Sequence, residues 1–221
     1  MPRADLRLVN ASRDEDYQER ILPGVSRTFA LTIPELPPGL RRAVANAYLL
    51  CRIADTIEDE PALAQDQKQQ FHKTFTAVVA GDADADTFAQ ALTPLLSKST
   101  LEAERDLVAN TARVLAVTNT LGDEQRRAVA RCVTVMCKGM PQFERKASRE
   151  GLEQLADLDL YCYYVAGVVG QMLADLFCDF CGETNQNREE LQRLSVSFGQ
   201  GLQMTNILKD IWEDYQRGVC W

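Results

Sequence analysis

Apolar residues recur every three or four positions along most of this chain, the spacing of a helix that buries one face. In the first clear segment, residues 40–60, the apolar positions at this spacing are Val44, Ala47, Tyr48 and Cys51. The same periodicity predicts helices over residues 124–140, 157–181 and 188–215. No alternating pattern of the strand type extends beyond a few residues. The sequence therefore predicts an all-α fold.

Turn-forming residues separate these helical segments. Prolines and a glycine interrupt residues 34–39, and the polar residues 1–13 are expected to be loosely held. Pro61 ends the first clear segment, an acidic turn follows at residues 81–86, and a further break falls at residues 121–123. There is no tandem repeat or low-complexity tract. With 221 residues, the chain fits one domain spanning residues 1–221.

Composition and charge narrow the functional class. The chain is 46% apolar and 25% charged, which is ordinary for a globular protein, and its formal net charge is −8. Because no basic surface is evident that could neutralise phosphates, we expect no nucleic-acid partner. An acidic site that accepts an anionic substrate only after binding a divalent cation remains compatible with this charge.

The cysteines and the longest apolar run bear on localisation. The seven cysteines make an odd count, and the chain does not open with a signal-peptide pattern, so we expect reduced thiols and a cytoplasmic protein. The longest apolar run, residues 165–177, is interrupted by Gln171 and Asp175 and is too short to span a bilayer. A buried core helix explains it better. Peripheral association with a membrane is left open, and so is the oligomeric state.

Three carboxylates fall on one face of the predicted helix over residues 40–60. Asp55, Glu58 and Asp59 are three or four positions apart, so their like charges repel one another and weaken the helix. Mg²⁺ bound through carboxylate oxygens, with waters and a substrate phosphate, would compensate this repulsion. Arg52 and Tyr48 lie one and two turns earlier on the same face, where a guanidinium can bind a diphosphate bidentately. Taken alone, this motif is equally compatible with a solvated acidic helix end.

A second acidic motif lies about 150 residues further along, in the predicted helix over residues 188–215. Its polar residues form one stripe at helical spacing: Gln203, Asn206, Asp210, Glu213 and Asp214. The rest of this segment is apolar, and a helix that is apolar nearly all round is normally buried. We therefore expect the stripe to face an enclosed cavity, where carboxylates are costly unless they are paired or bound to metal. Two such motifs can face each other across a helical bundle as one cation site.

Asp55-x-x-Glu58-Asp59 and Asp210-x-x-Glu213-Asp214 resemble the paired aspartate-rich motifs of the squalene/phytoene synthase family. Three further segments are similar to that family: Ser-Arg-Thr-Phe-Ala at residues 26–30, Tyr-Leu-Leu-Cys-Arg at residues 48–52, and Tyr-Cys-Tyr-Tyr-Val-Ala-Gly-Val-Val-Gly at residues 161–170. The five segments occur in order, and the resemblance runs from about residue 22 to residue 221. It implies an isoprenoid synthase-type bundle of helices around a central cavity.

The resemblance also implies a role for each matching position. Residues matching those that bind Mg²⁺ and the diphosphates are Asp55, Glu58, Asp59, Asn206, Asp210, Glu213 and Asp214. Residues matching further diphosphate contacts are Ser26, Arg27, Tyr48, Arg52 and Gln203. Tyr161 matches a tyrosine implicated in proton handling and carbocation control, and with the four aspartates it would make up the catalytic set. Lys209 stands where many members carry Arg, so it keeps the charge but loses the bidentate fork.

The implied reaction joins two farnesyl diphosphates head to head through a cyclopropylcarbinyl diphosphate, with Mg²⁺ polarising the leaving group. Proton loss would involve Tyr161 or, alternatively, the released diphosphate as base. Reduction by NADPH would give squalene, and without reduction the product would be of the dehydrosqualene or phytoene kind. Residues 26–31 and 48–59 look more like squalene synthases, which favours squalene. Because no G-x-G-x-x-G fingerprint is present, NADPH would bind without a Rossmann unit.

The segment after Tyr161 has two interpretations. Val165, Ala166, Val169 and Gly170 offer small and branched apolar surface against which isoprenoid tails could lie. Gly167 and Gly170 would also let a neighbouring helix approach closely, and a packing helix is by itself the more common meaning of such a pattern. The two acidic motifs favour the functional interpretation.

The remaining features are weaker. Cys178-x-x-Cys181 lacks a second pair and the one histidine, His72, is distant in sequence, so structural thiols are favoured over a zinc site. His72 lies in the polar run 67–73 and is expected to be exposed. A non-catalytic assembly factor is the alternative class, but such relatives have lost aspartates that are all present in this chain. The family continues past the second motif, so we expect the C-terminal helices to be missing and three apolar residues to be exposed: Trp212, Val219 and Trp221.

Overall fold

The computed structural model describes the backbone of residues 3–26, 28–144 and 148–221, and the side chains of residues 12–26, 28–143 and 148–221. Within this described part the regular elements are all helical, and the extended pairing consists of one isolated bridge between Ser148 and Cys220. The predicted all-α class is confirmed.

Short turns and loops connect the helices in chain order. They are α1 (Arg3–Val25), α2 (Phe29–Thr32), η1 (Ile33–Glu35), α3 (Pro38–Asp59), α4 (Gln65–Ala80), α5 (Ala85–Leu92), η2 (Thr93–Leu95), α6 (Glu102–Ala109), α7 (Thr111–Thr118), α8 (Asp123–Glu144), α9 (Leu155–Cys162), the π-helical turn η3 (Tyr163–Gly167), α10 (Val168–Phe180), α11 (Gly182–Gln186) and α12 (Arg188–Gln216).

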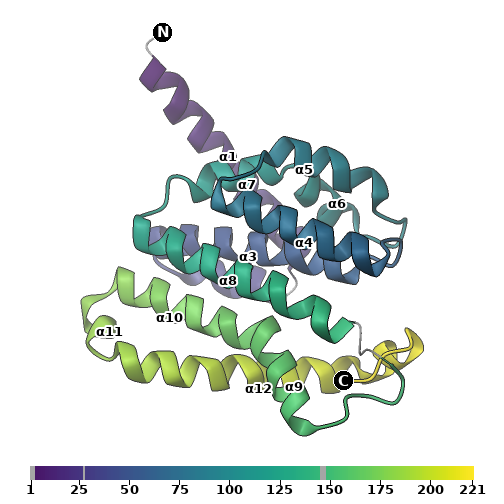
Figure 1. Cartoon of the computed structure of the whole chain (residues 1–221). Helices are drawn as coiled ribbons and strands as arrows, with labels where there is room; N and C mark the ends of the chain where they lie inside the picture. Colours follow the sequence, from purple (N-terminus) through teal and green to yellow (C-terminus); the bar gives the residue numbers. More distant parts are fainter. Residues whose placement is uncertain (1–2, 27, 145–147) are drawn as a thin grey trace.

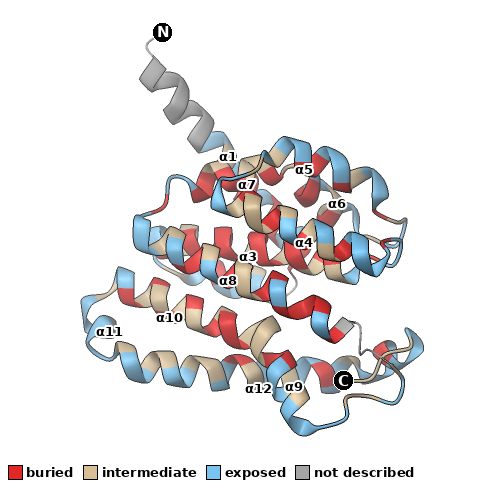
Figure 2. Cartoon of the chain, viewed as in Figure 1, coloured by how far each residue is buried: buried red, intermediate tan, exposed pale blue. Residues whose placement is uncertain are grey.

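Helix α3 runs through the centre of the molecule and contacts α1, α4, α8 and α10, whereas α12 lies on the far side of α10 (Figure 1). Helix α8 contacts α3, α4 and α10, and α10 in turn packs along α12. Figure 2 shows buried residues concentrated on α3 and on the inner sides of α8 and α10. Leu49, Leu50 and Ile53 on α3 are fully buried, and Met136 and Met172 meet them from α8 and α10. This core fixes the direction of α3 and thus the position of its acidic end.

The end of α3 is fixed by a capped turn. Glu60 leaves the helical conformation, and its buried carboxylate accepts hydrogen bonds from the backbone N–H groups of Ala62 (2.9 Å) and Ser97 (3.0 Å) and from the Thr100 hydroxyl (2.5 Å). These bonds satisfy backbone donors in the loops and hold the chain as it leaves the helix. Asp59, the last residue of α3, is therefore held at a defined place.

The predicted helix over residues 157–181 is interrupted by the π-helical turn η3. A π turn inserts one extra residue and rotates the helix beyond it, and such turns are frequent at functional sites. Tyr161 consequently points into a small cluster with Phe143 and Ile207, whereas Val168 and Met172 beyond the turn join the main core. The sequence pattern did not predict this change of face.

Helices α10 and α12 cross at very short range because glycines lie at the contact. A Cβ atom added to Gly170 would lie 2.2 Å from the backbone oxygen of Ser195, and one added to Gly199 would lie 2.3 Å from that of Ala166. The predicted close approach at Gly170 is thus confirmed. By length and composition the run Leu155–Phe180 could cross a membrane, although the buried core helix of a soluble protein satisfies the same test.

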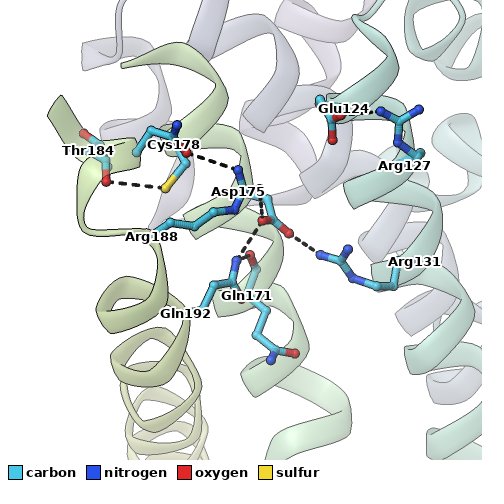
Figure 3. Close-up of polar contacts among 10 residues, drawn as sticks. Glu124, Arg127, Arg131, Gln171, Asp175, Cys178, Thr184, Arg188 and Gln192 are labelled. Carbon is cyan, nitrogen blue, oxygen red and sulfur yellow. Dashed lines mark hydrogen bonds and ion pairs between the residues drawn. The ribbon is translucent and has the colours of Figure 1, made fainter. Parts of the chain in front are cut away.

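A buried carboxylate ties three helices together at the other end of α10. Asp175, whose side chain is 12% exposed, pairs with Arg131 of α8 and Arg188 of α12 (Figure 3). Gln192 of α12 donates to the same carboxylate (2.9 Å) and also to the backbone oxygen of Gln171 (3.1 Å). Because this charged group is paired on two sides, its burial is compensated. The network holds α12 along α10.

Three expectations from the sequence require correction. Helix α1 extends from Arg3 to Val25, so residues 3–13, expected to be loosely held, are helical. His72 is buried, not exposed, because α4 packs against α3, α5 and α8. Helix α12 is not buried all round, since its apolar side points outward and Trp212 is 66% exposed.

The prediction for the last residues holds only in part. Trp212 is exposed as expected, but Val219 and Trp221 are half-buried. Trp221 packs against the small cluster around Tyr161 and is not left open to solvent.

Candidate active site

The acidic end of α3 carries two carboxyl groups in an unfavourable environment. Desolvation by the surrounding protein raises the pKa of Asp55 from its usual 3.8 to about 7, against the opposing charge of Arg52. Desolvation likewise raises the pKa of Asp59, although solvent still reaches that side chain. The Asp55 side chain is 34% exposed and Asp59 is exposed, so neither carboxylate is sealed in the core. Their negative charge is only partly compensated, as expected of a cation-binding surface.

Arg52 is held in place by a residue that the sequence motifs did not identify. Its Nε donates to Glu104 Oε1 of α6 at 3.1 Å, its Nη2 donates to the same oxygen, and its Nη1 lies 3.7 Å from Asp55 Oδ2. Burial by itself lowers the pKa of Arg52, but the negative charges of Asp55, Glu104 and Asp59 outweigh it and raise the pKa above its usual value. Arg52 therefore stays protonated beside the acidic motif.

The segment after α1 lies next to Tyr48. The Tyr48 hydroxyl donates to the backbone oxygen of Val25 (3.0 Å), and the buried Ser26 hydroxyl accepts from the backbone N–H of Phe29 (3.0 Å). Desolvation raises the pKa of Tyr48, so it stays neutral, although Ser26 and Arg52 oppose the shift. Ser26 and Tyr48 are thus brought together as predicted from the motifs. Arg27 lies outside the described residues.

Helix α12 presents the second motif unevenly. Asp214 is buried and pairs with Arg217 one turn later, while Asp210 is half-buried and lies 3.4 Å from Lys209 Nζ. Gln203 is half-buried as well, whereas Asn206 and Glu213 are exposed. The stripe therefore runs from inward-facing Asp214 to solvent-facing Glu213, with Asp210 between them.

Two residues link the motifs of α3 and α12. Arg217, hydrogen-bonded to Asp214, also lowers the pKa of Asp59 by its positive charge, although desolvation of Asp59 prevails. Burial raises the pKa of Tyr161 far above its usual range. The negative charges of nearby carboxylates raise it further, and these carboxylates are Glu58, Asp59, Asp55 and Asp214. Carboxylates of both motifs thus act on the Tyr161 hydroxyl. The two acidic motifs and Tyr161 share one electrostatic environment although they are distant in sequence.

Tyr161 is enclosed by aromatic rings. Its ring stacks on that of Trp221 at a centroid distance of 4.0 Å and an interplanar angle of 8°, and Phe143 lies against it at 5.6 Å. Trp221 is brought there by the bend at Gly218 and by the pairing of Cys220 with Ser148. The phenol is therefore shielded from bulk water on the side of Trp221.

The carboxylates suit a Mg²⁺ ion that takes its remaining ligands from water or from a bound phosphate group. Among the residues with described side chains, no group of three or more histidine, cysteine or acidic side chains is close enough to hold a metal ion unaided. Mg²⁺ commonly binds through one or two carboxylates, with phosphate oxygens and waters completing its six ligands. Desolvation raises the pKa values of Asp55 and Asp59, so their charged forms are unfavourable without a cation and would be stabilised by one. The donor set thus suits Mg²⁺ together with a diphosphate.

An apolar groove of about 520 Å³ lies between α10 and α12, toward the end away from the acidic motifs. Its lining includes Leu173, Phe177, Leu194 and Phe198. From Phe198 to Asp210 there are twelve residues, which is about 18 Å along a helix at 1.5 Å per residue. The groove therefore lies about 18 Å along α12 from the second acidic motif.

Residues 22–221 match the family model described as squalene/phytoene synthase. The chain belongs to the squalene/phytoene synthase family. Within this family it is 30% identical over 206 residues to squalene synthase clz20 of Cochliobolus lunatus, covering 93% of this chain and 47% of that protein. It is 31% identical over 201 residues to the squalene synthase of Eremothecium gossypii, covering 90% and 44%.

Solved structures of the family agree with this fold. The complex of TcSQS with the ligand BPH1237 superposes with a TM-score of 0.74 at 29% identity, over 91% of this chain and 55% of that one. A dehydrosqualene synthase bound to a ligand has a TM-score of 0.63 at 24% identity, over 96% and 61%, and shares the fold. The chain spans about half the length of these relatives. The isoprenoid synthase-type helical fold implied by the motifs is confirmed.

Sequence reasoning identified the acidic motifs and Tyr161 but missed three contributors to this site. Glu104 holds Arg52 from another helix, Arg217 links the motifs, and Trp221 covers Tyr161. Arg217 has a local signal, since it stands three positions after Asp214 on the same helix. Nothing in the local pattern around Glu104 indicates its partner.

Proposed function

We propose that this protein catalyses the Mg²⁺-dependent head-to-head condensation of two farnesyl diphosphates through a cyclopropylcarbinyl diphosphate to squalene. The observation that carries the proposal is the electrostatic environment that Tyr161 shares with Asp55, Asp59 and Asp214. The similarity to squalene synthases over about nine-tenths of the chain supports the reaction class. It also supports a prenyltransferase over a non-catalytic assembly factor, because all four motif aspartates are present.

The proposed metal ligands are the acidic residues of the two motifs with Asn206. They are Asp55, Glu58, Asp59, Asn206, Asp210, Glu213 and Asp214. Mg²⁺, when bound there, would supply Lewis acidity toward the leaving diphosphate and would neutralise its charge. The half-buried position of Asp210 and the partial exposure of the Asp55 side chain leave these carboxylates accessible to such an ion.

The diphosphate groups would be bound by the cationic and hydroxyl residues around the motifs. Arg52, oriented by Glu104, is preorganised for bidentate contact with phosphate oxygens. Ser26 and Tyr48 lie at the same end of the site, and Gln203 and Lys209 come from α12. Arg27, which matches a diphosphate-contacting position in the sequence, completes the proposed set.

Tyr161 would act as a neutral phenol. Its raised pKa, caused by burial and by the surrounding carboxylates, keeps the hydroxyl protonated at physiological pH. A neutral phenol is a poor base, so the released diphosphate is favoured as acceptor of the proton lost in the first condensation. The Tyr161 ring and the stacked Trp221 would shield the carbocation from water, which would otherwise trap it.

The apolar groove between α10 and α12 supplies the proposed surface for the isoprenoid tails. Gly170, Leu173 and Phe177 line it, and Gly170 belongs to the segment that suggested a tail site. For the final reduction we propose NADPH, bound outside any Rossmann unit. We further propose that residues 1–221 act as one domain in the cytoplasm, with peripheral membrane contact through exposed apolar residues.

Product analysis by mass spectrometry tests this proposal. The purified protein is incubated with farnesyl or geranylgeranyl diphosphate and Mg²⁺, each with and without NADPH. Squalene formed only from farnesyl diphosphate with NADPH is the expected result, and dehydrosqualene or phytoene in both conditions would identify the non-reducing alternative. The absence of any condensed product, with both substrates bound, would favour the non-catalytic class.

A further inference from the structure

We infer that Arg217 is an exchangeable counter-ion, which pairs with Asp214 of the second acidic motif in the metal-free protein and contacts the diphosphate once Mg²⁺ and substrate have entered. The inference rests on the proposed function, because it assigns a further diphosphate-binding residue to the same site. No part of the aspartate-rich motifs includes this residue, which lies three positions beyond Asp214.

Arg217 projects from the same side of α12 as the second motif. It is the C-cap residue of that helix, and residues three, four and seven positions apart lie on one helix face. Its Nη2 donates to Asp214 Oδ1 in an ion pair. Immediately afterwards the chain bends away at Gly218, whose φ of 88° is in the left-handed region that favours glycine. The guanidinium therefore lies at the end of the acidic stripe.

The charge of Arg217 reaches the first motif as well. The hydrogen bond with Asp214 is the largest influence that raises the Arg217 pKa, and the charges of Asp59 and Glu213 contribute to it. Of the other cations that act on Asp59, Arg52 is bonded to Glu104, and Lys68 donates to the backbone oxygen of Glu58. Arg217 is bonded to Asp214 of the second motif, and its positive charge also lowers the pKa of Asp59 in the first.

The two partners of the ion pair differ in their freedom to move. The Asp214 side chain is 9% exposed, whereas the Arg217 side chain is 64% exposed. A long, exposed arginine can rotate away from its partner at small cost in free energy, while the buried carboxylate stays in place. When Asp214 oxygens bind a metal, the guanidinium loses its acceptor and faces a bound diphosphate instead. Its planar set of N–H donors suits phosphate oxygens bidentately.

Two opposite effects follow for a variant without this charge. Without the competing guanidinium, Arg217→Gln should bind Mg²⁺ alone about two- to fivefold more tightly, the range expected for loss of an exposed ion pair. With Mg²⁺ saturating, it should bind inorganic pyrophosphate at least tenfold more weakly, because a charge-assisted contact is lost. Arg217→Lys should lie between the wild type and Arg217→Gln in pyrophosphate affinity, since it keeps the charge without the fork.

Isothermal titration calorimetry with Mg²⁺, and then with inorganic pyrophosphate at saturating Mg²⁺, measures both effects. The matched control is Arg193→Gln, which removes an arginine paired with Glu190 three positions away on the same helix. It should change neither affinity, and circular dichroism should show that all variants are folded.

The outcomes separate this inference from the proposed function. Wild-type protein that binds neither Mg²⁺ nor pyrophosphate would overturn both. Wild-type binding with an Arg217→Gln pyrophosphate affinity within twofold of it would overturn the inference alone. Weakened pyrophosphate binding with unchanged Mg²⁺ affinity would overturn the counter-ion role.

Discussion

Replacing Asp55 with Asn should stabilise the metal-free protein at alkaline pH, because it removes a carboxylate that the fold holds at an unfavourable place. The Asp55 pKa rises from 3.8 to about 7 on folding, a difference of about 3 units. At 1.36 kcal/mol per unit this is about 4 kcal/mol. Since a third of the side chain reaches solvent, we halve the value to about 2 kcal/mol.

The sign of this effect depends on pH. Below about pH 4 the carboxyl is protonated in both the folded and the unfolded state, so ionisation has no effect on stability. Between about pH 4 and 7 the unfolded chain ionises first, and the folded state loses stability relative to it. Asn does not ionise, so the advantage of Asp55→Asn should be near zero at pH 4 and complete at pH 8.

Urea unfolding followed by circular dichroism, in EDTA at pH 4, 6 and 8, measures this difference. The exposed Asp82 supplies the control, since Asp82→Asn should change the free energy of unfolding little at any pH. Mg²⁺ with pyrophosphate should then stabilise the wild type more than Asp55→Asn. The reasoning would be refuted if Asp55→Asn were less stable than the wild type at pH 8, or if its gain were equal at all three pH values.

Three further predictions concern other parts of the fold. His72 is buried and its pKa is lowered to about 4, so between pH 6.5 and 4 the unfolded chain takes up a proton before the folded one does. The free energy of unfolding should therefore fall by up to about 3 kcal/mol over this range. In urea unfolding at each pH, His72→Gln should show a smaller fall than the wild type. Asp210→Asn should keep the thermal midpoint but lower product formation by orders of magnitude, and near-normal turnover would contradict its role. Gly170→Ala should lower the free energy of unfolding by about 1–3 kcal/mol, because its Cβ would meet the Ser195 backbone. Gly201 has open space around it, so Gly201→Ala should be neutral or stabilising in thermal unfolding.

Local periodicity is sufficient to predict the long helices. The helix predicted over residues 40–60 is α3, and that over 188–215 is α12, because apolar spacing of three and four residues indicates a helix whether or not its apolar face is buried. The signal for α1 is also present, since Tyr17, Ile21 and Val25 recur at four-residue spacing and are buried. The π turn is not predictable in this way, because it depends on packing against α8 and α12.

Burial depends on neighbours, which a single helix does not specify. The apolar pattern of α12 predicts complete burial, yet Leu208 and Trp212 are exposed, whereas Asp214 of the polar stripe is buried. An exposed apolar surface of this kind marks a place where another element or partner binds. His72 shows the opposite case, since a polar stretch of sequence contains a buried position.

The candidate site is predictable as far as it depends on motifs. The spacing within each acidic motif places its carboxylates on one helix face, and the family resemblance relates the two motifs to Tyr161. The contacts made by Glu104 and Arg217 depend on how separate helices meet. The assignment of each residue to metal or diphosphate remains a prediction.

A double-mutant cycle tests most directly the central claim that both motifs act on one leaving group. Mg²⁺-dependent pyrophosphate release from farnesyl diphosphate is measured for the wild type, Asp55→Asn, Asp210→Asn and the double variant. We predict that each single change lowers the rate by orders of magnitude and that the double variant is little slower than either, because the two carboxylates act as a unit. Losses that multiply, or a single variant with near wild-type release, would contradict a shared site.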